Sequence, residues 1–198
     1  MPKPQKHERV DRRVQRSRQL LQDALIAMMI EKGYEATTVQ DIIDRANVGR
    51  ATFYAHFADK ETLLTSRLED LRAFLIERQQ QAPGLGFSLA MLEHARDHLP
   101  LYAAIVGRGG GSGAFVIQRI HATIVDLARR ALQTLGMKGS PERRTLAAQY
   151  IAGAFMAVLT WWLDQAAKLP AEEVDGIFRT LVMRGLAAEV DAAAASRK

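Results

Sequence analysis

The stretch TTVQDIIDRANVGRATFYAHFADKETLL, residues 37–64, predicts two short helices joined by a tight turn and followed by the start of a third. Apolar residues recur at three- and four-residue spacing in the first helix, at Val39, Ile42, Ile43 and Ala46. This spacing gives the helix one apolar face. Thr37 or Thr38 is expected to cap its start, because a hydroxyl there accepts a hydrogen bond from an otherwise unpaired backbone N–H.

The turn and the second helix have a different composition. Asn47, Val48 and Gly49 interrupt the helical pattern, since Asn and Gly supply the backbone angles that a tight turn needs. In the helix predicted over residues 50–57, Phe53 and Phe57 point inward. The outward residues comprise one cation, small groups and hydrogen-bonding tips without an acid: Arg50, Ala51, Thr52, Tyr54 and His56. Such a helix fits the recognition helix of a helix-turn-helix, which lies in the DNA major groove.

The third helix completes a recognisable pattern. Asp59 is expected to cap it, and its first turn carries Lys60 at a position suited to hold a phosphate. The run ANVGRATFYAHF at residues 46–57, followed by DKE at 59–61 and LL at 63–64, resembles the DNA-binding signature of TetR-type transcriptional regulators. Flanking segments resemble these proteins too. Two positions depart from the usual pattern: Gly49, where Ser or Thr is common, and Ala51, where Gly is frequent.

The resemblance implies specific roles in DNA binding. It places Arg50 and Thr52 at base edges with Ala51 beside them, and an arginine fork can bond guanine O6 and N7 together. It also implies phosphate contacts, which fix register rather than sequence, at Thr38, Tyr54, His56 and Lys60. For Tyr54 and His56, capping of the small core is the open alternative.

Charge and composition agree with an anionic partner. The 198-residue chain is 48% hydrophobic and 25% charged, as in ordinary globular proteins, and carries a net charge of +5. The excess lies at the N-terminus, where two acids accompany Lys3, Lys6, Arg9, Arg12, Arg13, Arg16 and Arg18. A solvated tail would explain this run, but beside a helix-turn-helix we favour an arm that binds the DNA backbone.

Several classes of protein are disfavoured by what the sequence lacks. It contains no cysteine, so disulfides and thiolate chemistry are excluded. The polar N-terminus predicts no secretory leader. The longest apolar run, residues 150–163, is shorter than the roughly twenty residues that span a bilayer. We therefore expect a cytoplasmic protein without a membrane partner.

Helical periodicity continues to the end of the chain and predicts an all-α fold of about nine helices. We expect a helix-turn-helix domain with its basic arm at residues 1–65, and a helical ligand-binding and dimerisation domain at residues 66–198. A long helix should run from the first domain into the second and act as a lever. Beyond the motif, the predicted helices cover residues 16–32, 60–80, 88–99, 100–106, 114–136, 141–168 and 171 onwards.

The helix over residues 141–168 is apolar nearly all round between residues 150 and 163, so both of its sides must be buried. One side can face its own core and the other a second chain, with close approach allowed by Ala152, Gly153, Ala154 and Ala157. The end of the chain also resembles TetR-type proteins, in which the last two helices pair between subunits. This predicts a homodimer that reads a palindromic operator on double-stranded DNA.

A small-molecule pocket is expected between the helices of the second domain. Its candidate lining residues are Met91, Leu92, Phe115, Tyr150, Phe155, Met156 and Trp161, and ordinary core packing is the open alternative for each. His94 and His98 have the spacing of metal ligands. Exposed positions on an amphipathic helix explain them more simply, so we expect no metal or other cofactor. The glycine-rich residues 107–113 predict a loop or hinge rather than a phosphate-binding loop.

These features predict a ligand-responsive transcriptional regulator, most simply a repressor released from its operator by a small molecule of unknown identity. An enzyme is not expected, because no residue pattern nominates a nucleophile or a paired acid and base. The alternative is a DNA-bound architectural or partner-recruiting protein of the same fold without a small-molecule inducer.

Overall fold

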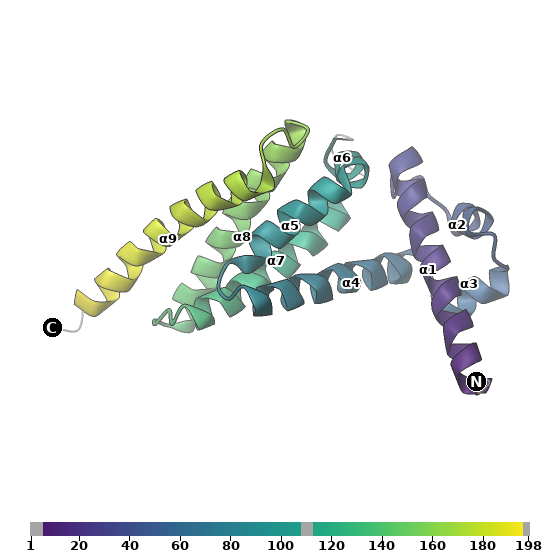
Figure 1. The fold of residues 1–198 in the computed structure, drawn as a ribbon, viewed down its shortest axis with the longest axis horizontal. Helices are drawn as coiled ribbons and strands as arrows, with labels where there is room; N and C mark the ends of the chain where they lie inside the picture. Colours follow the sequence, from purple (N-terminus) through teal and green to yellow (C-terminus); the bar gives the residue numbers. More distant parts are fainter. Residues whose placement is uncertain (1–5, 108–112, 196–198) are drawn as a thin grey trace, which may run out of the picture.

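A computed structural model of the chain describes residues 6–107 and 113–195, and these parts form nine helices (Figure 1). In order they are α1 (Lys6–Lys32), α2 (Val39–Ala46), α3 (Arg50–His56), α4 (Lys60–Gln81), α5 (Gly86–Asp97), α6 (Leu99–Gly107), α7 (Ala114–Thr134), α8 (Pro141–Asp164) and α9 (Ala171–Ala195). No strand occurs in the described parts. The predicted all-α fold is confirmed, and the differences from prediction lie at helix ends.

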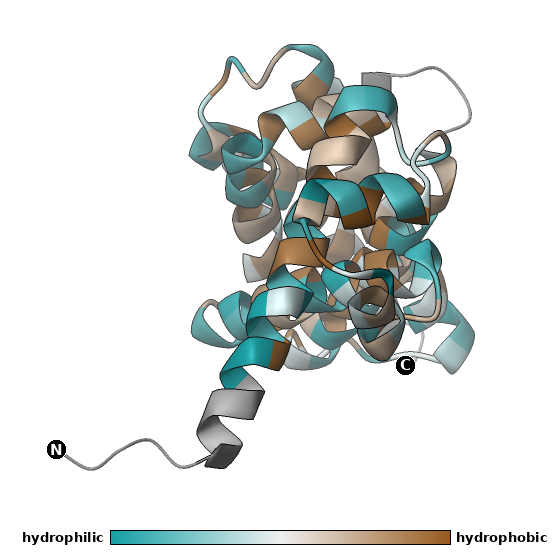
Figure 2. Cartoon of the chain, turned by 90° about the vertical axis from the view of Figure 1, so that its right-hand side faces the viewer, coloured by the Kyte–Doolittle hydropathy of each residue, from teal (hydrophilic) through white to brown (hydrophobic). Residues whose placement is uncertain are grey.

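α1 is longer than predicted. It begins at Lys6 rather than near residue 16, because residues 6–32 contain no Gly or Pro and many strong helix formers. The predicted arm is therefore largely helical, and α1 extends beyond the other helices (Figure 2). Arg12, Arg13 and Arg16 are exposed along it. Lys3 lies outside the described residues, as do the side chains of Lys6 and Arg9.

The α2–turn–α3 unit has the predicted form. Thr38 is the N-cap of α2, and its hydroxyl accepts a hydrogen bond from the Asp41 N–H in a capping box. Asn47 has a φ of 50°, the left-handed conformation that a turn between two helices requires. Phe53 and Phe57 are both buried and pack against each other. The inward-facing prediction for these two rings is therefore confirmed.

α4 connects the N-terminal helices to the remainder of the chain (Figure 1). Asp59 caps its first turn by accepting a hydrogen bond from the Thr62 N–H at 2.7 Å. α4 packs against α1 and also against α5 and α7. One helix therefore contacts both groups of helices, as predicted.

The second group of helices is held by a buried polar contact as well as by apolar packing. The amide of Gln79, near the end of α4, donates to the carbonyl oxygens of Gly84 at 2.8 Å and Leu127 at 3.0 Å. These bonds attach the end of α4 to the following turn and to α7. Residues 108–112 of the predicted glycine-rich loop lie outside the described residues.

α8 ends earlier than predicted, at Asp164 instead of near residue 168. Ala166 and Ala167 adopt left-handed backbone angles, with φ of 54° and 51°, which are incompatible with a continued helix. The Trp162 indole N–H donates to the Leu169 carbonyl at 2.9 Å and holds the turn that leads to α9.

α8 is also the one described helix that is long and apolar enough to cross a membrane, although its apolar run was predicted to be too short. Its inner face, which includes Phe155, Leu159 and Trp162, is buried against the rest of the protein. A core helix passes the same test of length and composition, so the test is weak evidence for a membrane span.

The outer sides of α8 and α9 carry large apolar side chains that are at least half exposed. We call these residues the α8–α9 apolar face: Leu146, Tyr150, Trp161, Ile177 and Leu181. On α8 the exposed small residues Gly153 and Ala157 continue the same stripe. By contrast Phe178, Val174 and Val182 of α9 are buried within the chain.

Candidate functional site

The outward side of α3 presents the side chains that the sequence assigned to DNA. Arg50, Ala51 and Tyr54 are exposed, and Thr52 is half-buried. The Arg50 guanidinium carbon lies 5.6 Å from the centroid of the Tyr54 ring, and its Nη1 reaches Gln40 Oε1 at 3.4 Å. Both contacts are loose, so the guanidinium keeps donors for another partner. Because Phe53 anchors α3 in the core, this polar surface has a fixed orientation.

Two predicted phosphate contacts already have partners inside the protein. The Thr38 hydroxyl bonds to Asp41 Oδ2 at 2.5 Å within the capping box. A hydrogen bond from Lys32, reinforced by Thr38, holds the pKa of Asp41 well below its usual range, so this carboxylate is ionised. His56 Nε2 lies 2.7 Å from the Ser17 hydroxyl and links the end of α3 to α1.

Tyr54 differs from Thr38 and His56, because no hydrogen bond engages its hydroxyl among the described residues. Its ring is exposed and packs edge-on against Phe53. The hydroxyl is therefore available to a partner outside the protein.

Lys60, the fourth predicted phosphate contact, is also engaged within the protein. Its ammonium donates to the carbonyl oxygens of Tyr34 at 2.9 Å, Glu35 at 3.2 Å and Thr37 at 2.9 Å. It also lies 4.5 Å from the centroid of the Tyr34 ring. An ammonium has three donors, so all of them are used. Lys60 thus ties the α1–α2 loop to the first turn of α4, a role that charge and helix position alone do not reveal.

We expect Lys60→Met to lower the free energy of unfolding by about 2 kcal/mol, because hydrogen bonds from a charged donor to half-buried carbonyls are lost. Urea denaturation measures this. Lys138→Met, at an exposed position, is the matched control and should change stability by less than about 0.5 kcal/mol. If Lys60→Met instead leaves stability unchanged and weakens DNA binding, the predicted phosphate contact is right.

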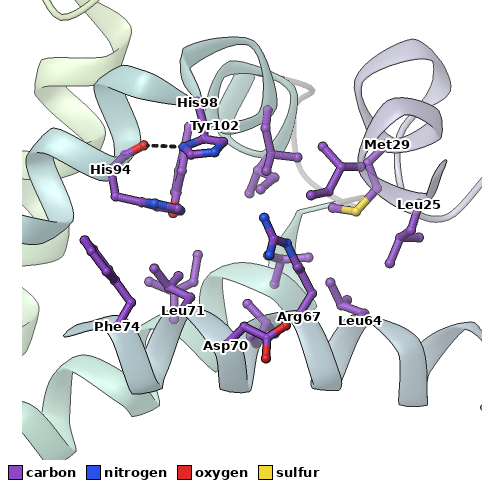
Figure 3. Close-up of a pocket in the computed structure, with 16 residues that line it drawn as sticks. Leu25, Met29, Leu64, Arg67, Asp70, Leu71, Phe74, His94, His98 and Tyr102 are labelled. Carbon is purple, nitrogen blue, oxygen red and sulfur yellow. Dashed lines mark hydrogen bonds between the residues drawn. The ribbon is translucent and has the colours of Figure 1, made fainter. Parts of the chain in front are cut away.

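A cavity of about 210 Å³ lies between α1, α4, α5, α6 and α7 (Figure 3). Leu, Ile, Met and Val side chains form most of its wall, including Leu25 and Met29 from α1. Its polar residues are Arg67, Asp70, His94, His98 and Tyr102. The cavity is therefore apolar with a few polar groups, the usual character of small-molecule sites.

None of the predicted lining residues lines this cavity, although Phe115 and Tyr150 each border another groove. Met91, Leu92 and Phe155 are fully buried core residues, and Met156 packs against the core. Phe115 stacks on Tyr34, with ring centroids 6.2 Å apart. Tyr150 and Trp161 face outward on α8. The apolar character of a residue does not by itself show whether the residue lies in the core, in a cavity wall or on the outer face.

His94 and His98 lie in the cavity wall rather than on an exposed helix face as predicted. Their ring centroids are 4.3 Å apart, and His98 Nδ1 lies 2.9 Å from the His94 carbonyl oxygen. Burial, aided by nearby His98 and Arg67, lowers the pKa of His94 to about 4, so its ring is neutral near pH 7. Among the described residues, no group of three or more His, Cys, Asp or Glu side chains is placed to hold a metal.

Arg67 is one of the cavity residues that sequence reasoning missed. A signal was present, because Arg67 interrupts the apolar face of α4 formed by Leu64, Leu68 and Leu71. A cation on an otherwise apolar helix face must have either a hydrated position or a specific partner.

Comparison with known proteins relates the N-terminal helices to a protein family. The family model described as "Bacterial regulatory proteins, tetR family" matches residues 21–66, which extend from α1 into α4. The HTH-type transcriptional regulator YxbF of Bacillus subtilis is 28% identical over 180 residues, covering 85% of this chain. The chain spans only 45% of that relative's length. The HTH-type transcriptional repressor KstR2 of Mycobacterium tuberculosis is 41% identical over 68 residues, 34% of this chain and 32% of the relative.

The fold is also similar to a solved structure over almost its whole length. The TetR transcriptional regulator from Streptococcus agalactiae 2603V superposes with a TM-score of 0.68 and 26% identity, covering 89% of this chain and 98% of that one. These relatives are transcriptional regulators and not enzymes. The α2–α3 helix-turn-helix, the all-helical fold and these similarities together support a TetR-type transcriptional regulator.

Proposed function

We propose that this protein is a dimeric repressor released from its operator when a small molecule occupies the cavity. The observation that carries this proposal is which helices form two of the cavity walls. α1 and α4 line the cavity; α1 packs against α2 and α3, and Lys60 of α4 holds the loop that leads into α2. A ligand that changes the spacing between α1, α4 and α6 therefore moves the recognition helix.

In this proposal residues 1–65 form the DNA-binding unit and residues 66–198 the ligand-binding and dimerisation unit. α3 enters the major groove, where Arg50 and Thr52 reach base edges and Ala51 allows close approach. Tyr54 is the main phosphate contact of α3, since its hydroxyl is not engaged within the described residues. Exposed Arg12, Arg13 and Arg16 on α1 supply sequence-independent attraction to the DNA backbone. A regulator of bacterial DNA acts in the cytoplasm, which is the location we propose.

The α8–α9 apolar face is the proposed dimer interface. A contiguous apolar surface of this kind is uncommon on a monomer and marks an interaction site. Leu146 and Tyr150 of α8 border the same groove as Gly185 of α9, so the two helices present one surface. A two-fold dimer through this surface places two α3 helices on the two halves of a palindromic operator.

Repression and release follow because DNA and the effector each bind a different arrangement of the helices more tightly. DNA favours the arrangement whose recognition helices are about 34 Å apart, one DNA turn. The effector favours an arrangement in which α4 and α1 have moved, and only this difference in affinity can shift the population. The repressor named among the relatives supports this direction of control.

Calorimetry tests this proposal with an operator selected from random DNA and an effector found by thermal-shift screening. A coupling of about 1–3 kcal/mol makes the effector lower operator affinity by roughly 5- to 150-fold. By reciprocity, the operator must lower effector affinity by the same factor. If the effector binds equally well with and without operator, it does not control DNA binding and the proposed function is wrong for that effector.

A further inference from the structure

The cavity beside α1 contains a cation that makes no ion pair with a side chain in the described part of the chain. Arg67 is the one Lys or Arg in its wall, and no hydrogen bond or ion pair joins its guanidinium to any other described residue. Figure 3 shows the Arg67 side chain rising from α4 towards α5 and α6. A guanidinium in a largely apolar site needs an anionic partner or water to offset its desolvation.

The nearby acid does not fill this role. Asp70 is exposed and stays close to α4, where its Oδ2 accepts a hydrogen bond from Gln22 Nε2 at 2.8 Å. The Asp70 carboxylate is thus held at the rim by α1. No ion pair forms between Arg67 and Asp70, although they lie on the same helix.

The other polar groups near Arg67 add hydrogen-bonding capacity. Tyr102 is almost fully buried, and its hydroxyl makes no hydrogen bond within the described residues. Burial raises the pKa of Tyr102 far above its usual value, so the hydroxyl keeps its proton and remains a donor. His94 is neutral near pH 7 because burial lowers its pKa. The wall therefore combines a permanently charged cation, a hydroxyl donor and apolar surface.

We infer that the cavity binds a small carboxylate with an apolar body, and that Arg67 is the residue that pairs with the carboxylate. The planar guanidinium fork matches the two carboxylate oxygens. A single fixed cation suits a monoanion better than a phosphate dianion, whose second charge would be unpaired in this apolar wall.

The volume limits the size of the apolar body. An apolar cavity of about 150 Å³ holds benzene, and this cavity is about 210 Å³. It therefore accommodates one ring or a short branched or linear chain together with the carboxylate. This inference rests on the proposed function only where it names the chemical class of the effector. Binding of the carboxylate to the cavity is measured without DNA.

Matched probes test the inference by calorimetry: benzoate and hexanoate, their neutral amides benzamide and hexanamide, and inorganic phosphate. We expect the carboxylates to bind about 10- to 100-fold more tightly than the amides, the range of a charge-assisted hydrogen bond. Phosphate should bind more weakly than either carboxylate. Equal binding of acid and amide, or preferred binding of phosphate, would overturn the inference, as would failure of both carboxylates to raise the melting temperature at millimolar concentration.

Variants of Arg67 then test whether this residue causes the preference for carboxylates over amides. Arg67→Gln should remove the carboxylate preference, about 10- to 100-fold, while leaving amide binding nearly unchanged. Arg67→Lys should show a partial loss, because it keeps the charge without the fork. Arg72→Gln on the same helix, outside the cavity wall, is the matched control and should keep the preference. If Arg67→Gln folds normally and still prefers carboxylates, Arg67 is not the anchor.

An operator-binding assay with the same probes separates the two proposals. A carboxylate that binds through Arg67 without changing operator affinity supports this site and refutes its role as the inducer site. A neutral effector that enters the cavity and releases the operator supports the proposed function and refutes the carboxylate class.

Discussion

Leu181→Glu is expected to convert a dimer into folded monomers and to remove most operator affinity. Leu181 is 62% exposed in the single chain, so glutamate there does not disturb the core. In a two-fold interface the substitution buries two unpaired carboxylates, which is among the most destabilising changes known. Monomers bind each half-site separately, so affinity for the full operator should fall by about 100- to 10,000-fold, the usual gain from linking two binding modules.

Sedimentation and a fluorescence-based operator assay measure both effects. Met183→Glu is the matched control, since Met183 is exposed on the same helix but lies about 200° further round. It should remain dimeric and bind operator normally. A wild-type protein that sediments as a folded monomer at micromolar concentration would contradict the proposed interface. A Leu181→Glu protein that stays dimeric would place the interface elsewhere.

Arg50→Ala is expected to reduce the ability of the protein to distinguish its operator from random DNA. The Arg50 guanidinium is exposed on α3 and has only a 3.4 Å contact to Gln40 and a stacking contact to Tyr54. These contacts orient the guanidinium while leaving its donors free for a guanine edge. Loss of one bidentate base contact costs about 1–3 kcal/mol of discrimination, or roughly 5- to 150-fold.

The measurement compares affinities for operator and for random DNA at one salt concentration. Arg45→Ala is the control, because Arg45 lies in the same motif but pairs with Glu31 at 2.7 Å. Arg45→Ala should weaken binding to operator and to random DNA only slightly, and by the same factor. Equal, large weakening by Arg50→Ala on both DNAs would show that Arg50 contacts phosphate instead of a base.

The sequence alone determined the helix-turn-helix and the helical fold. Local rules govern these features: a capping hydroxyl at Thr38, a left-handed residue at Asn47, and paired inward rings at Phe53 and Phe57. Each rule acts within a few residues, so it can be read without knowing the rest of the fold. The predicted helix ends were less accurate, since α1 extends to Lys6 and α8 stops at Asp164.

The sequence also correctly suggested that α8 has two apolar sides, but it could not tell which residues lie on each. That distinction depends on which helices pack against α8. The structure buries Phe155 and Trp162 and leaves Tyr150 and Trp161 outside. A charge introduced at Phe178 would damage the core instead of testing dimerisation, because this side chain is buried within the chain.

Only the tertiary structure decided the role of Lys60 and the position of the cavity. The carbonyls that bind Lys60 belong to a loop more than twenty residues earlier, and its first-turn position gave no sign of them. The cavity collects side chains from α1, α4, α5, α6 and α7, which are distant in sequence. Apolar periodicity shows that a residue faces inward. Whether it meets another side chain or an empty volume depends on how the facing helices pack, and that packing placed the cavity beside Arg67 and against α1.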